Sequence, residues 1–452
     1  MRIRRSWLWI GFAGVNAAAA GYFVQRWQGP DRTVFLPGPT THGHYQIELD
    51  CQACHTPWMG VQEAACYKCH EAELKLADDS HPKSKFTDPR NADRLQLIDA
   101  ANCVTCHREH VPQRTGTMGV TMPSDYCFHC HQQTLKDRPS HRDLPFNSCA
   151  TAGCHNYHDN TALYESFLLK HLDEPDVRPE PRVARRTVAA FTNAPLTATG
   201  QDAPATAASD PAILQEWVST AHAVAGVNCT GCHAPAGKGG TPATWTDHPT
   251  HEACASCHKG ESEGFLAGRH GMRLAQGLSP MQPALARLPM KADAAHRDLA
   301  CTSCHGDHDF NTRRAAVEAC MSCHNDPHTL AYTRSPHYTL WQEELSGSAP
   351  AGSGVSCATC HLPAETVTVD GSQRVVTQHN QNAHLRPNEK MVRTVCLDCH
   401  GLSFALDALA DADLIQANFR GSPSRHVESL GMAAARRRML ETTKKTTSRN
   451  TP

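Results

Sequence analysis

Cysteine and histidine recur together along this chain in a fixed short pattern. The 452 residues include 22 cysteines and 30 histidines. Every cysteine belongs to a pair, and a histidine directly follows the second cysteine of each pair. The eleven sets are Cys51, Cys54 and His55; Cys66, Cys69 and His70; Cys103, Cys106 and His107; Cys127, Cys130 and His131; Cys149, Cys154 and His155; Cys229, Cys232 and His233; Cys254, Cys257 and His258; Cys301, Cys304 and His305; Cys320, Cys323 and His324; Cys357, Cys360 and His361; Cys396, Cys399 and His400.

This pattern suits the covalent attachment of haem. Two thiols can bond to the two vinyl groups of one haem, and the adjacent histidine then ligates its iron. A disulfide framework gives no reason for a histidine after every second cysteine. Zinc sites combine two pairs and do not demand that histidine. The sequence therefore predicts eleven covalently bound haem c groups, with the eleven motif histidines as proximal iron ligands. The fifth motif has four intervening residues and needs a wider loop.

Nineteen histidines lie outside the motifs, enough to supply a second axial ligand for every iron. His110, His158 and His308 each follow a motif histidine by three residues, on the same helical face. They cannot reach the far side of their own haem and should serve a neighbouring one. At least eight of the nineteen must have another role at the surface or in hydrogen bonds. The favoured distal ligands are His110, His158, His222, His270, His296, His308, His337 and His426.

Short helices and irregular loops should position these residues. The chain is 40% hydrophobic and 6% aromatic, which is thin for an ordinary apolar core. We expect a mainly α fold with extensive irregular loops and little β structure, in which haem faces replace apolar side chains. A hairpin is predicted at 365–377, with Asp370 and Gly371 at its turn. The predicted helices span 158–172, 212–226, 262–276, 330–346, 403–417 and 424–441.

The motifs fall into two groups separated by a stretch rich in Pro, Ala and Thr. Five motifs lie before residue 156 and six after residue 228, whereas 174–211 contain neither cysteine nor histidine. That composition predicts a semi-extended linker; an ordered strap over the surface is the alternative. The predicted parts are an anchor (1–30), a five-haem domain (31–173), the linker (174–211), a six-haem domain (212–435) and a basic tail (436–452).

The N-terminal residues are typical of a membrane anchor. Arg2, Arg4 and Arg5 precede residues 6–24, a stretch without charge that is long enough to cross a bilayer. The positive-inside rule places the N-terminus in the cytoplasm and the haem domains in the periplasm, on a single-pass protein of the inner membrane. The alternative is a cleaved signal peptide, for which Ala17 to Ala20 could supply the cleavage site.

Two resemblances to known families refine this interpretation. Dense motifs with histidines just ahead of them make the first half resemble small multihaem domains of the cytochrome c3 and c7 type. Residues 213–432 resemble the hydroxylamine oxidoreductase and octahaem or pentahaem nitrite reductase superfamily, through CMSCHNDPHTLAYTRSPH, GVSCATCHLP and RPNEKMVRTVCLDCH. In that family an aspartate and a histidine line the distal side of the catalytic haem, and the nearest matches here are Asp326, His328 and Tyr332.

The superfamily resemblance also locates the haem at which catalysis would occur. It implies that this haem is the one on Cys254, Cys257 and His258, and that any activity is reductive. The family's adjacent Asp and His stand here on either side of Pro327.

Two functions are therefore weighed: an electron conduit, and a reductase of nitrite, hydroxylamine or a similar small oxyanion. The reductase needs an open iron at His258, whereas a conduit would fill that position with a spare histidine such as His270 or His251. The expected partners are the inner membrane and redox proteins or a quinol-linked donor. The formal charge of -2 shows no basic excess, so no nucleic-acid partner is expected. The oligomeric state stays open.

Overall fold

The structure is a computed structural model that covers most of the chain. It describes residues 2–29, 32–77, 81, 86–96, 99–123, 125–137, 157–159, 163–184, 194–207, 210–235, 244–369, 371–385 and 387–449. The fifth motif, Cys149, Cys154 and His155, lies outside these residues. The chain forms two compact units: Met1–Cys69 with Pro89–Pro123, and His70–Asp88 with Ser124–Pro452. The domain limits predicted from the sequence stay a prediction.

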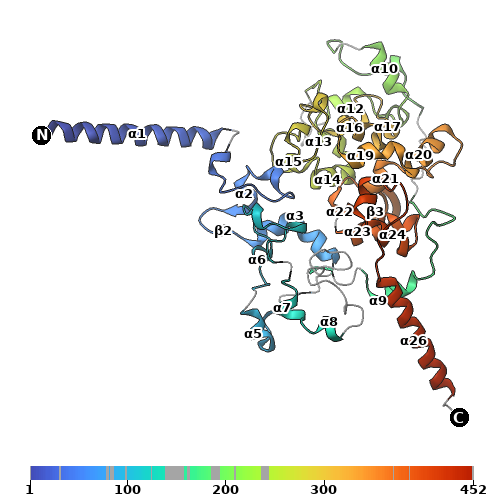
Figure 1. Ribbon diagram of the computed structural model, residues 1–452. Coiled ribbons are helices and arrows are strands. Elements are labelled where there is room, and N and C mark those ends of the chain that lie inside the picture. The colour runs from blue at the N-terminus through green and yellow to red at the C-terminus, as the bar shows by residue number, and fades with distance from the viewer. Residues whose placement is uncertain are drawn as a thin grey trace. The chain divides into compact units, whose positions relative to one another are not determined.

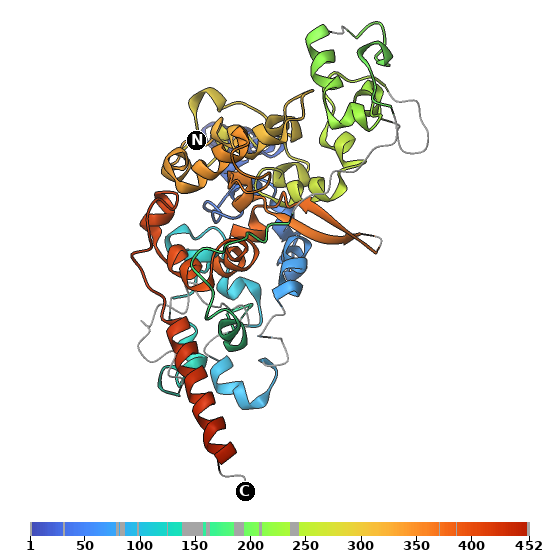
Figure 2. The ribbon, with the colours of Figure 1, turned by 90° about the vertical axis from the view of Figure 1, so that its right-hand side faces the viewer.

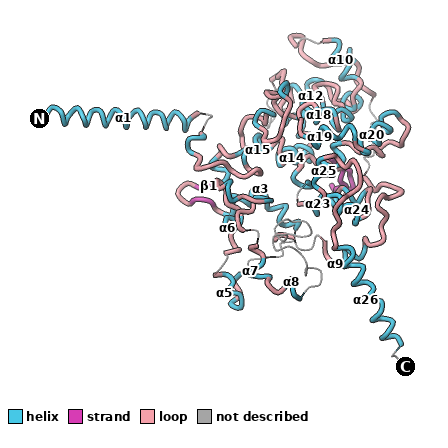
Figure 3. Tube along the Cα trace, viewed as in Figure 1, coloured by secondary structure: helices cyan, strands magenta, loops and turns pink. Residues whose placement is uncertain are grey.

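The first unit contains one long helix and several short elements around the first three motifs (Figures 1 and 3). In helix α1, residues 6–28 are long and apolar enough to cross a membrane, and no part of that stretch is buried. The elements are α1 (Arg2–Gln28), η1 (Thr33–Phe35), η2 (Tyr45–Ile47), α2 (Cys51–Cys54), β1 (His55–Thr56), β2 (Gly60–Val61), the start of α3 (Glu63–Ala77), η3 (Pro89–Asn91), α5 (Ala92–Leu95), α6 (Cys103–Cys106), η4 (Pro112–Arg114) and η5 (Thr117–Gly119).

The second unit is a succession of short helices joined by long loops, as the cyan and pink segments of Figure 3 show. Its elements are α7 (Phe128–His131), α8 (Thr134–Asp137), α9 (Glu165–Lys170), η8 (Ala198–Gly200), α10 (Pro211–Val218), α11 (Ala221–Val224), α12 (Cys229–His233), α13 (His251–Ala255), α14 (Lys259–Ala267), α15 (Met272–Ala275), η9 (Pro283–Leu285), η10 (Ala292–Ala294), α16 (Cys301–His305), α17 (Thr312–Ala316), α18 (Glu318–Met321), α19 (Pro327–Ala331), η11 (Tyr332–Arg334), α20 (Pro336–Ser346), α21 (Cys357–His361), β3 (Ala364–Val369), β4 (Ser372–Thr377), α22 (Asn382–Leu385), α23 (Asn388–Thr394), η12 (Cys396–Asp398), α24 (Leu402–Ala410), α25 (Ala412–Gln416) and α26 (Ser429–Arg449).

The expected fold class is confirmed: the described chain is mainly helical, and its sheets are two small hairpins. The hairpin predicted at 365–377 is confirmed as well, because β3 pairs antiparallel with β4 from Ala364↔Thr377 to Val369↔Ser372. Gly371 takes the left-handed backbone, with φ at 75°, that the turn requires. Figure 2 shows this hairpin as two orange arrows.

Several predicted helices are shorter than expected because new helix starts interrupt them. Thr220 caps α11 and separates it from α10, where a single helix over 212–226 was predicted. Asp411 caps α25 and in the same way divides the predicted helix 403–417. Helix α14 ends where the backbone of Gly268 becomes extended, and the absence of a Cβ at Gly268 allows the close approach of the His379 carbonyl oxygen, which would lie 2.9 Å from a Cβ. The C-terminal helix begins at Ser429 and continues to Arg449, into the predicted basic tail.

The apolar core of the second unit surrounds the last motif. Leu402 and Val392 are both fully buried there. Leu163 and Leu168, from the segment around α9, and Leu430, from α26, pack into the same cluster. Elements far apart in sequence therefore meet at the motif of Cys396.

Part of the predicted linker lies against that same motif. We call residues 174–182 the strap. Its backbone bonds to the motif, with Arg178 N donating to Cys399 O at 2.8 Å and Arg182 N to Asp398 O at 2.7 Å. Val177 also forms a β-bridge with His400. These contacts are those of an ordered surface segment.

Candidate functional site

Most of the described motifs adopt one recurring local structure, a single helical turn, whereas the motif of Cys66 lies within the longer helix α3. In six of the described motifs the histidine N–H donates to the carbonyl of the first cysteine, for example from His107 to Cys103 at 2.9 Å and from His400 to Cys396 at 2.8 Å. Residues at i, i+3 and i+4 lie on one face of such a turn. Both thiols and the imidazole of a motif therefore face the same side, as attachment of one haem requires.

The described cysteines are unpaired thiols. All twenty are free of disulfide bonds, including Cys51 and Cys399. Within the described ranges, no group of three or more Cys, His, Asp or Glu side chains is placed to hold a metal ion by itself. The motif thiols remain available for thioether bonds.

Histidine rings face one another in pairs throughout the described part of the chain. Every such contact joins one motif histidine to one histidine outside the motifs, with ring centroids 5.9 to 6.5 Å apart. The eight pairs are His55 with His110, His131 with His81, His233 with His308, His258 with His222, His305 with His379, His324 with His270, His361 with His328 and His400 with His337.

The spacing within these pairs fits one iron between two imidazoles. A metal–nitrogen bond is about 2 Å long, and the nitrogen lies roughly 1.1 Å from the centre of its ring. With one imidazole on each side of the metal, the two ring centroids are therefore about 6.2 Å apart. The observed range brackets this value. The angle between ring planes varies from 9° for His233 and His308 to 89° for His81 and His131, so the pairs are not simple ring stacks. The residues present therefore fit haem iron held by two histidines.

Hydrogen bonds turn several of these rings so that Nε2 is the free nitrogen. The Nδ1 atom of His110 lies 2.6 Å from Gly38 O, that of His379 lies 2.8 Å from Thr377 O, and that of His328 lies 2.5 Å from Ile415 O. A carbonyl oxygen only accepts, so Nδ1 carries the proton and Nε2 keeps its lone pair for a metal. His328 differs from the other two, because Asn418 Nδ2 lies 3.3 Å from its Nε2 atom and can donate to that lone pair.

The structure brings five of the eight favoured distal histidines opposite a motif histidine: His110, His222, His270, His308 and His337. His110 and His308 each face the histidine of a motif other than their own, as their offset implied. The exposed His426 instead has Nδ1 3.1 Å from Asp407 Oδ2. No ring contact places His158 or the exposed His296 opposite a motif histidine within the described residues.

Three facing histidines were not among the favoured ones: His81, His328 and His379. His379 follows strand β4, and His81 is far along the chain from its partner motif. No sequence pattern close to either residue therefore indicates that it is an iron ligand. His328 had been weighed as a catalytic residue. In the sequence, only the number of histidines outside the motifs indicated that residues such as these three could be ligands.

The three candidate catalytic residues do not converge on the haem of His258. His328 faces His361, and Tyr332 is buried with its hydroxyl donating to Val355 O at 2.8 Å. Burial raises the pKa of Tyr332 far above its usual value. Asp326 caps α19: burial alone would raise its pKa, but hydrogen bonds from Thr329 hold the pKa below its usual value. The ring opposite His258 is that of His222, and neither His270 nor His251 takes this place.

Thiols of successive motifs lie beside one another. Cys254 and Cys301 are within hydrogen-bonding reach, as are Cys320 and Cys357 in the second unit and Cys66 and Cys103 in the first. A haem attached through one of these thiols would have its edge beside the attachment site of the next motif.

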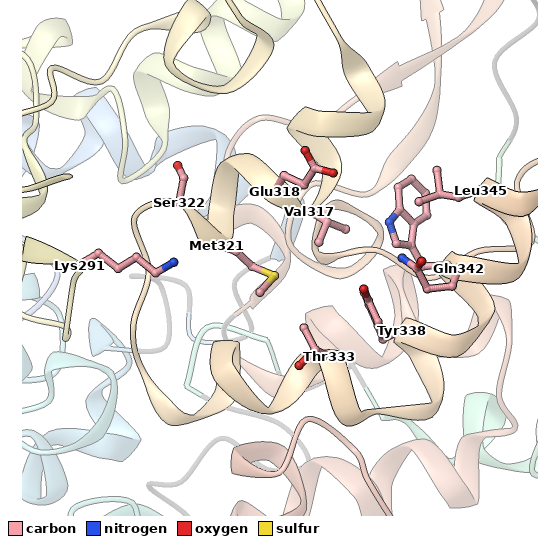
Figure 4. A pocket seen from close by; sticks show the side chains of 10 residues that line it. Lys291, Val317, Glu318, Met321, Ser322, Thr333, Tyr338, Gln342 and Leu345 are labelled. Carbon is pink, nitrogen blue, oxygen red and sulfur yellow. The ribbon is translucent and has the colours of Figure 1, made fainter. Parts of the chain in front are cut away.

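A surface pocket of about 360 Å³ lies beside the motif of Cys320 (Figure 4). Met321 and Ser322, the two residues between the cysteines, form part of its wall, and Lys291 and Glu318 contribute opposite charges. No histidine lines this pocket, and neither do Asp326 and Tyr332. It is therefore distinct from the volumes between paired histidines.

Comparison with known proteins bears on the first third of the chain. The family model described as cytochrome c3 matches residues 43–132, which contain the first four motifs. No curated protein and no solved structure matches the chain. The comparisons give no support to the resemblance of residues 213–432 to the hydroxylamine oxidoreductase superfamily. Residues 43–132 are thus similar to cytochrome c3, which supports a multihaem c-type cytochrome domain of electron transfer, with covalently bound haem c, in this N-terminal part of the chain.

Proposed function

We propose that this protein is a membrane-anchored periplasmic cytochrome with eleven haems that conducts electrons. One observation carries the proposal: each histidine–histidine contact in the described chain joins a motif histidine to an outside one, at the spacing of two axial ligands. Two strong axial ligands make haem iron an electron carrier and leave no position for substrate.

The neighbouring thiols support a continuous path for electrons. In the second unit, Cys232 interacts with Cys254, Cys304 with Cys323 and Cys360 with Cys399. Together with the hydrogen-bonding pairs Cys254 and Cys301 and Cys320 and Cys357, these electrostatic interactions indicate that the thiols of each motif from the sixth to the eleventh lie near those of the next. Six haems on these motifs would form one relay in sequence order.

The proposed location rests on helix α1. Residues 6–28 can span a bilayer, and the preceding arginines favour a cytoplasmic N-terminus. The haem domains would then face the periplasm, where a membrane-bound or quinol-linked donor could deliver electrons and a redox protein could receive them.

The contact of His222 with His258 argues against the reductase alternative. A reductase of this type requires an open iron with proton donors beside it. The iron on His258 would instead have a second imidazole, and the groups expected to supply protons lie elsewhere.

Mass measurement and electron paramagnetic resonance test this proposal together. The mature protein should carry eleven haems, and its ferric spectrum should be low-spin throughout. A mass that corresponds to fewer than ten haems would contradict the count. High-spin ferric haem, with turnover of nitrite or hydroxylamine that His328→Ala abolishes, would establish the reductase instead.

A further inference from the structure

The Nδ1 atom of His222 is buried without any hydrogen-bond partner among the described residues. A histidine that ligates iron through Nε2 must carry its proton on Nδ1. This buried N–H therefore lacks an acceptor, which is costly in a folded protein. A hydrogen-bond acceptor at Nδ1 also raises the basicity of a ligating imidazole, so its absence weakens the bond from His222 to a metal.

Four of the other seven facing histidines are anchored through Nδ1, and among the eight only His222 has a buried Nδ1 without a partner in the described residues. The Nδ1 atoms of His110, His328 and His379 each donate to a backbone carbonyl, and that of His81 lies 2.5 Å from Tyr157 O. These bonds fix the rotation of each ring. The ring of His222 has no such bond to hold it against its motif partner.

An aromatic side chain holds His222 instead. The ring of Phe310 packs edge-on against the imidazole, with centroids 4.4 Å apart and planes at 73°. Phe310 has a φ of 44°, a left-handed conformation in which a bulky residue is strained. The next residue, Asn311, donates its N–H to His305 O at 2.7 Å and ties this strained backbone to the neighbouring motif.

The backbone of His222 is fixed even though its ring is not. Thr220 caps the short helix α11, and Val227 N donates to His222 O at 2.9 Å. Ala223, the next residue, is completely buried. The ring can therefore leave its position by side-chain rotation alone, without unfolding the segment.

We infer that His222 is a displaceable ligand, and that the haem on His258 is a site at which a small neutral ligand of ferrous iron, of the diatomic gas type, binds in its place. In this exchange the bond between iron and His222 Nε2 breaks, and its electron pair returns to the neutral imidazole. The lone pair of the incoming ligand forms the new bond. No electron or proton is transferred. The inference rests on the proposed function, since it requires haem at Cys254 and Cys257.

Carbon monoxide added to the dithionite-reduced full-length protein tests the inference. The absorbance change should correspond to one haem among the eleven. Phe310→Leu removes the ring contact and should tighten carbon monoxide binding about two- to tenfold. In His222→Ala the number of carbon monoxide-binding haems should remain one, with faster binding because no side chain has to leave.

Phe419→Leu is the matched control. Phe419 also has a left-handed backbone, with φ at 57°, and its ring contacts His328 and His337. Because His328 is anchored to Ile415 O, the haem that His328 faces should gain no carbon monoxide site in this variant. If the unaltered protein binds no carbon monoxide, or if His222→Ala raises the number of sites from one to two, the inference is overturned. A full complement of low-spin haem in the same sample would show that the proposed function survives that outcome.

Discussion

Replacement of His379 by alanine should disrupt one iron-ligand pair and leave the other pairs intact. The His379 ring lies 6.2 Å from that of His305, and its Nδ1 donates to Thr377 O at the end of β4. Alanine removes the second axial ligand of the haem on Cys301 and Cys304. One haem in eleven, about 9% of the total, should then change from low to high spin. Loss of the hydrogen bond should lower the free energy of unfolding by about 1 kcal/mol.

Quantified ferric electron paramagnetic resonance measures this change. His426→Ala is the matched control, since that side chain is 59% exposed and lies beside Asp407. The sequence pattern favoured His426 over His379 as an iron ligand, whereas the ring contacts in the structure favour His379. The two variants therefore test which of these predictions is correct. A fully low-spin His379→Ala protein, or a high-spin haem in His426→Ala, would refute the reasoning from ring spacing.

Three further outcomes are expected. Leu402→Ala should lower the free energy of unfolding by about 3 to 4 kcal/mol in urea titrations, because Leu402 is fully buried, whereas the half-exposed Leu285 should tolerate alanine within about 0.5 kcal/mol. The His384 imidazole lies 3.0 Å from Glu365 and lowers the pKa of the Glu365 carboxyl. The stabilisation by the ionised Glu365 carboxyl should therefore be present above about pH 4.5 and disappear as the pH falls through the lowered pKa. In Glu365→Gln, the free energy of unfolding should not show this decrease with falling pH. Deletion of residues 2–28 should move the protein from the membrane pellet to the soluble fraction, and recovery of the intact gene product as a soluble form starting near residue 21 would instead show a cleaved signal.

Local features of this molecule could be predicted from the sequence, because they depend on residues a few positions apart. The spacing of Cys103, Cys106 and His107 requires one helical turn, and α6 provides it. The hairpin of β3 and β4 follows from alternation around a turn that ends in Gly371. Helix limits were harder, because the caps Thr220 and Asp411 are polar residues within otherwise helical patterns.

The ligand partners could be predicted only in part, because they join residues from different segments. The offset of His308 from its own motif excluded its own haem, but nothing local indicated that its ring would face His233. His379 has no neighbouring motif, and its position depends on where β4 ends. His426 looked equivalent in sequence, yet Asp407 on α24 takes its ring nitrogen.

The contacts of the strap have a consequence for biosynthesis. Arg178 bonds through Nε to Leu397 O, 219 residues further along the chain, and His400 Nδ1 lies 2.9 Å from Asp176 O across 224 residues. Contacts of such high sequence separation form late in folding, because a long loop must close first. The last motif therefore remains uncovered until nearly the whole chain is present, which would leave time for thioether formation before the strap covers it. Maturation of this cytochrome should accordingly finish at its C-terminal end, and a chain truncated before Cys396 should leave the strap accessible to proteases.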